Sequence, residues 1–151
     1  MNEDQDRDFI SHVRGRLEAE RSHEMLCIKK IVGDRDILGK GLEHFWNDFR
    51  KATGELCERL SREFGLSLSC RWNGKELNVT SPKKHGCLSA TRGDAPPYEV
   101  VLLGHDGFRY SATIRIRLDD SQLGWLVVLD DSPTSARKVA SHALEAFVFA
   151  Q

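Results

Sequence analysis

The histidine and cysteine side chains of this 151-residue sequence are the ones best suited to metal or covalent chemistry. His85 and Cys87 form a close pair, but no second pair follows at the spacing of a zinc finger. A structural zinc site needs four ligands, usually in two short-spaced pairs. His44 and Asp48 could share a helix face, yet they lack a third partner. The sequence therefore predicts no metal site and no cofactor.

Nucleophilic chemistry has no recognisable local signature either. The chain has no G-x-S-x-G elbow, no C-G-x-C-W context and no H-E-x-x-H helix. Gly39-Lys40-Gly41 lacks the spacing and the Lys-Ser/Thr ending of a phosphate-binding loop. The sequence favours a non-catalytic role, while a catalytic site assembled from distant residues stays open.

Composition and charge set the class of protein. Hydrophobic residues make up 40% and charged residues 30%, which is an ordinary balance for one globular domain, here residues 1–151. The net charge of -1 gives no global field, so a polyanion would have to be bound by a local basic patch. The acidic N-terminus does not resemble a signal peptide, and no apolar stretch approaches membrane-spanning length. We therefore expect a cytoplasmic chain with reduced cysteines and no membrane contact.

The first half of the sequence has helical periodicity. Apolar residues mark one stripe over 9–17 and another over 25–32, separated by the polar segment 18–24. Gly33 to Asp36 predicts a break, and a second helix should run from about Leu42 to Gly65. Because its stripe is interrupted, the N-terminal helix (residues 1–34) is expected to be peripheral or interfacial.

The second half has the alternating pattern of strands. We expect about five strands near residues 66–72, 75–80, 98–103, 108–118 and 123–129, with a type I′ turn at Asn73-Gly74. Residues 81–97 have a loop-like composition, and a further short strand near Cys87 to Ala90 stays open. Ser132-Pro133 predicts the start of a closing helix. Because the connections are short, the strands should pair in antiparallel fashion. The expected fold is α+β: an antiparallel meander preceded by two helices and covered on one face, as a two-layer sandwich.

One strand face would carry several arginines. If the even residues of 108–118 point to the core, the arginines point the other way and repel one another unless acids or a partner lie opposite. Neighbouring strands are apolar on both sides, so something should cover this face: the first helix, a second copy or another macromolecule. We therefore expect a protein that self-associates or docks a protein partner through this face and the N-terminal helix. The expected contact residues are Arg109, Arg115, Arg117, Val101, Leu126 and Val128.

Nucleic-acid or other polyanion binding is the alternative. A short basic loop with proline could touch phosphate groups, helped by arginines on nearby strands. The residues expected for this role are Arg71, Lys83, Lys84, His85 and Arg92. Against it, the face that carries the arginines lacks the interleaved aromatic residues that usually stack on bases. The sequence names neither the partner nor the oligomeric state.

Overall fold

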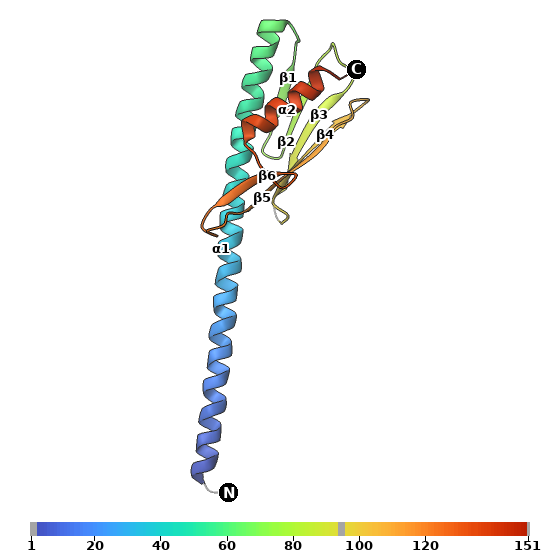
Figure 1. Ribbon diagram of the computed structural model, residues 1–151. Coiled ribbons are helices and arrows are strands. Elements are labelled where there is room, and N and C mark those ends of the chain that lie inside the picture. The colour runs from blue at the N-terminus through green and yellow to red at the C-terminus, as the bar shows by residue number, and fades with distance from the viewer. Residues whose placement is uncertain (1–2, 94–95, 151) are drawn as a thin grey trace. The chain divides into compact units, whose positions relative to one another are not determined.

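The computed structural model describes residues 3–93 and 96–150 (Figure 1). The elements are α1 (Glu3–Phe64), β1 (Ser69–Trp72), β2 (Glu76–Thr80), β3 (Cys87–Arg92), β4 (Glu99–His105), β5 (Ser111–Leu118), β6 (Trp125–Leu129), β7 (Ser132–Pro133) and α2 (Ala136–Val148). The chain divides into two compact units, Met1–Asp36 and Ile37–Gln151. The fold is of the α+β class, as the sequence predicts.

The first unit consists of the N-terminal part of α1. Among its described residues no side chain is buried. The predicted break at Gly33 to Asp36 is wrong, because α1 continues through this segment as far as Phe64. A single glycine costs a helix only about 1 kcal/mol relative to alanine, and no proline interrupts the segment. Two helices were expected before the sheet, and one is found.

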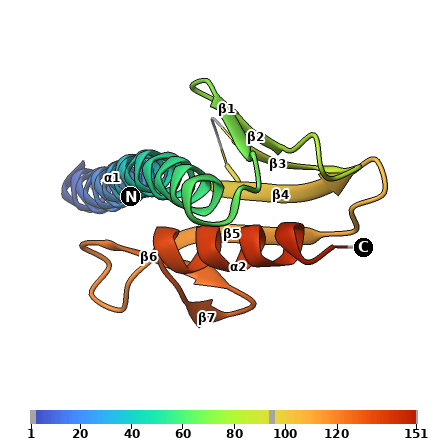
Figure 2. The ribbon, with the colours of Figure 1, turned by 90° about the horizontal axis from the view of Figure 1, so that it is seen from above.

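The second unit contains the sheet. Its strands follow one another in sequence order from β1 to β7, each antiparallel to the next, as Figure 2 shows. The antiparallel meander is confirmed, while the expected number of about five strands is corrected to seven: β3 forms where a short strand was left open, and β7 was not expected. The strand expected from residue 108 begins only at Ser111, so Arg109 lies outside it.

The extra strand β7 overturns the predicted helix start at Ser132-Pro133. Asp130 and Asp131 both have positive φ (50° and 62°), which turns the chain sharply so that Pro133 pairs with Val128. Helix α2 starts three residues later, where the hydroxyl of Ser135 accepts a hydrogen bond from the Lys138 amide (3.3 Å).

The other turns agree only in part with the predictions made from the sequence. Gly65 has φ 63° and ends α1 as predicted. Asn73 and Gly74 do turn the chain, but neither has positive φ, so the predicted type I′ turn is wrong. Instead, the side-chain oxygen of Asn73 accepts hydrogen bonds from the amides of Lys75 (2.8 Å) and Glu76 (2.9 Å).

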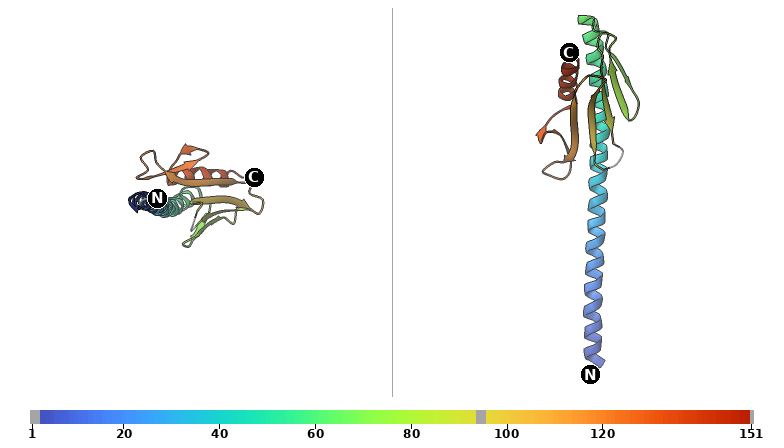
Figure 3. Two further views of the ribbon diagram at one scale, coloured as in Figure 1. Left: turned by 90° about the horizontal axis from the view of Figure 1, so that it is seen from below. Right: turned by 90° about the vertical axis from the view of Figure 1, so that its right-hand side faces the viewer.

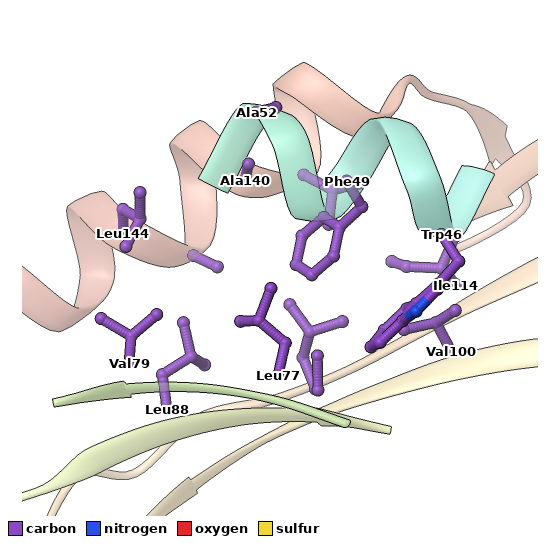
Figure 4. Packing of buried hydrophobic residues seen from close by; sticks show 14 of the residues in the cluster. Trp46, Phe49, Ala52, Leu77, Val79, Leu88, Val100, Ile114, Ala140 and Leu144 are labelled. Atoms are coloured by element: carbon purple, nitrogen blue, oxygen red, sulfur yellow. The ribbon is translucent and has the colours of Figure 1, made fainter. Parts of the chain in front are cut away.

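The core lies between the sheet and the two helices. Residues 42–57 of α1 and one side of α2 pack on the same face of the sheet (Figure 4). Phe45, Phe49 and Ile114 are all buried in this cluster, as predicted. Leu56 and Leu60, which continue the same helical spacing, are only half-buried. The C-terminal ends of α1 and α2 lie at the same end of this unit (Figure 3).

A glycine allows α1 to approach β6 closely. A methyl group at Gly41 would lie 2.5 Å from Cγ of Trp125 and 2.9 Å from Cγ2 of Ile116. We therefore expect Gly41→Ala to lower the free energy of unfolding by about 1–3 kcal/mol, the usual cost of overpacking a core. Gly39→Ala is the matched control, because a methyl group there meets nothing within 4 Å. Since alanine favours a helix, this control should be neutral or slightly stabilising in a thermal melt, and equal effects would contradict the packing.

Candidate interaction surfaces

The outer face of the sheet, opposite the helices, carries most of the contact residues predicted from the sequence. Across the β5–β6 pair, Arg115 lies beside Val128 and Arg117 beside Leu126. Val101 on β4 lies beside Thr113 on β5, on the same face. The structure therefore brings five of the six predicted residues together, because the register aligns the odd positions of β5 with the even positions of β6. Arg109 is exposed but precedes the strand.

This outer face is more polar than the sequence suggested. Val128 is buried, Val101 and Leu126 are half-buried, and the two arginines are exposed. Leu103 is 40% exposed and adds an apolar side chain that was not predicted. Arg115 Nε lies 3.8 Å from Glu99 Oε2, so an acid does lie opposite one arginine. Such a surface ion pair contributes little free energy.

The basic loop has a local structural role. Lys83 Nζ donates to the carbonyl oxygen of Gly65 at 2.6 Å, next to the end of α1. Lys84 Nζ donates to the carbonyl oxygen of Ala150 at 3.0 Å, next to the end of α2. Cations at helix C-termini stabilise the free carbonyl groups and the helix dipole. Both lysines are thus engaged by the fold, which the sequence did not predict.

The remaining predicted polyanion residues lie apart. Arg71 pairs with Asn78 and is exposed on the outer face. Arg92 pairs with Val100 on the side that faces the helices, and it is half-buried. His85 is exposed in the loop beside the lysines. The five residues therefore do not share one face of the fold.

Two polar groupings could support chemistry. Ser89 Oγ lies 2.7 Å from Nε2 of His105, which is the contact a nucleophile makes with its base. Both residues are on the open surface of β3 and β4, and among the described residues no group is found hydrogen-bonded to the other ring nitrogen. Without an orienting group or a cavity, this pair does not form a catalytic triad.

The second grouping is a pair of thiols, Cys57 on α1 and Cys70 on β1. A hydrogen bond from Cys57 holds the pKa of Cys70 below its ordinary value, and the same bond, together with burial, raises the pKa of Cys57. Neither is oxidised, since all four cysteines are free.

An apolar groove of about 460 Å³ lies between the ends of the two helices. Leu56, Leu60 and Phe64 line one side, and Leu144 and Val148 line the other. The sequence did not predict this groove. Leu56 and Leu60 continue the core stripe of α1. Whether such residues are buried or left in the groove depends on where α2 packs, which the periodicity of α1 does not predict.

Most of the large apolar side chains that are exposed in the described residues lie on the first unit. Of the fourteen large apolar side chains that are exposed among the described residues, nine lie within residues 9–32. Seven of them fall within an arc of about 120° of the helix circumference, at 100° per residue. We call these seven residues the N-terminal stripe: Ile10, Val13, Leu17, Met25, Ile28, Ile31 and Val32.

Residues 3–93 and 96–150 contain no cluster of three or more His, Cys, Asp or Glu that could hold a metal ion. His44 Nε2 lies 3.2 Å from Asp48 Oδ2, one helical turn away on α1. Neither described helix has a stretch long and apolar enough to cross a membrane. No family model, curated protein or solved structure matches this chain.

Proposed function

We propose that this protein is a non-catalytic assembly subunit that self-associates through the N-terminal stripe and uses the outer face of the sheet as a second contact surface. The exposure of the stripe carries the proposal. Its seven apolar side chains are between 39% and 61% exposed, and they line one side of a helix. Exposed apolar surface gathered on one side of a helix marks sites of protein association.

The composition of residues 3–36 adds a second reason. The stripe contains five β-branched residues, and Gly15 and Gly33 lie in the same segment. These residue types have low helix propensity, so this part of α1 gains little stability from its own sequence. Most helices in folded proteins gain their stability mainly from the packing of an apolar face. A partner on the stripe would supply that packing.

The outer face of the sheet fits a secondary contact. It combines exposed Arg115 and Arg117 with Leu103, Val101 and Leu126. Arginine and apolar residues are enriched at protein interfaces, whereas lysine is depleted. The proposal includes a cytoplasmic location, which is supported by the four free cysteines.

A polyanion partner is the alternative, but the structure offers it less support. Lys83 and Lys84 bind backbone carbonyl groups next to the helix ends. Arg71 and Arg92 belong to opposite faces of the sheet.

Leu126→Asp tests the contribution of the sheet. We expect it to weaken association about 30-fold, corresponding to about 2 kcal/mol for an interface hot spot, because an unpaired carboxylate would be buried in the contact. Leu123→Asp is the control, since Leu123 is 84% exposed in the loop before β6. Light scattering over a concentration series measures both variants. If the two variants associate equally well, the outer face of the sheet is not part of the interface, and only the N-terminal stripe remains as the proposed contact.

A further inference from the structure

The charges around the N-terminal stripe select both a partner and an orientation. We propose that two copies of this chain pair in antiparallel orientation over residues 6–35, with Ile10 opposite Ile31 and Val13 opposite Ile28 of the second copy. This inference rests on the proposed self-association and specifies its geometry. The paired segment would be about 45 Å long, at 1.5 Å per residue.

The stripe is apolar at its two ends and charged at its centre. Glu20, Arg21 and Glu24 follow Leu17 on or beside the same side of the helix, before the apolar residues resume. In a parallel pair in register, each of these charged residues would face its own copy. Like charges brought together at an interface oppose association, so this centre disfavours the parallel arrangement.

The antiparallel arrangement matches opposite charges. With the two-fold axis between residues 20 and 21, Glu20 of each copy lies opposite Arg21 of the other. Near the ends, Asp6 of each copy would lie opposite Arg35 of the other. Glu20 also has Arg16 of its own helix at 4.0 Å, so the central charges would form a small network. Complementary charges of this kind set register and orientation in paired helices.

The same alignment places apolar residues against apolar residues toward the two ends of the paired segment, whereas Leu17 lies level with Glu24 and Met25 with Arg16 of the second copy. At each end of the segment Ile10 would lie beside Ile31, and Val13 beside Ile28, of the second copy. Every large side chain of the first unit that takes part is exposed in the single chain, so pairing requires no rearrangement of the fold. A second copy would therefore supply apolar partners for the ends of the stripe and an opposite charge for Glu20 and Arg21 at its centre.

Disulfide trapping tests the orientation. All variants carry Cys27→Ser, because Cys27 is an exposed thiol. Val13→Cys and Ile28→Cys are made singly and together, at positions that are exposed and outside the core. After oxidation with oxidised glutathione, we expect the double variant to form a covalent dimer that links residue 13 to residue 28. Each single variant, and Cys27→Ser alone, should stay uncrosslinked in denaturing gels. Peptide mass mapping identifies the linkage.

The outcomes separate the orientation from the proposed function. If light scattering shows a dimer but either single variant crosslinks to itself, the pair is parallel and the inference is overturned, while self-association stands. A dimer whose double variant does not link residues 13 and 28 also overturns it. A monomer at high micromolar concentration contradicts both.

Discussion

Phe49→Ala is expected to lower the free energy of unfolding by about 3–5 kcal/mol, the usual cost of removing a buried aromatic ring. Phe49 is only 1% exposed, and its ring stacks on Phe45 with centroids 5.8 Å apart. In Figure 4 it points from α1 toward the sheet above Leu77. Little can collapse into the resulting cavity, because the helix and the sheet are held apart by neighbouring side chains.

Phe64→Ala on the same helix is the matched control. Phe64 is 66% exposed, so its removal should change the free energy of unfolding by well under the cost of a buried ring. Chemical denaturation followed by circular dichroism measures both variants. If Phe49→Ala unfolds at the wild-type denaturant concentration, the face of α1 assigned to the core is wrong.

Ile28→Asp is expected to raise the dissociation constant of the self-associated form more than 100-fold. Burying a carboxylate without a partner costs about 3 kcal/mol or more, and in a symmetric pair the substitution is present twice. Because residues 3–36 depend on packing for their helicity, the far-ultraviolet helix signal should fall as well.

Ala19→Asp is the control for this substitution. Ala19 is exposed on the side of the helix away from the stripe, and the new side chain has the same size and charge. It should leave the dissociation constant within a few-fold of wild type. Sedimentation equilibrium measures both variants, and an equal effect would show that aspartate disturbs the helix itself and not a contact.

The periodicity of the sequence identified the packed parts of the fold. Leu42, Phe45 and Phe49 repeat at helical spacing, and the even positions of β5 alternate with arginines, so burial followed directly from pattern. These segments could be predicted because hydrophobic burial alone decides their orientation. The same reasoning placed Arg115 and Arg117 on the outer face.

The periodicity of apolar residues could not predict the conformation of the turns or the lysine contacts near the helix ends. The break expected at Gly33 did not form, because a weak local preference cannot end a helix that has no strong stop signal. Pro133 pairs in β7 because the two preceding aspartates, Asp130 and Asp131, adopt positive φ. This conformation is rarely predictable from sequence for residues other than glycine. The roles of Lys83 and Lys84 depend on carbonyl groups 18 and 66 residues away in the chain.

Sedimentation equilibrium of the unmodified chain, from low to high micromolar concentration, tests the central claim of self-association most directly. The exposed N-terminal stripe predicts a mass that rises with concentration to that of a dimer, twice the 17.1 kDa of the single chain. A constant mass of one chain throughout this range would contradict self-association.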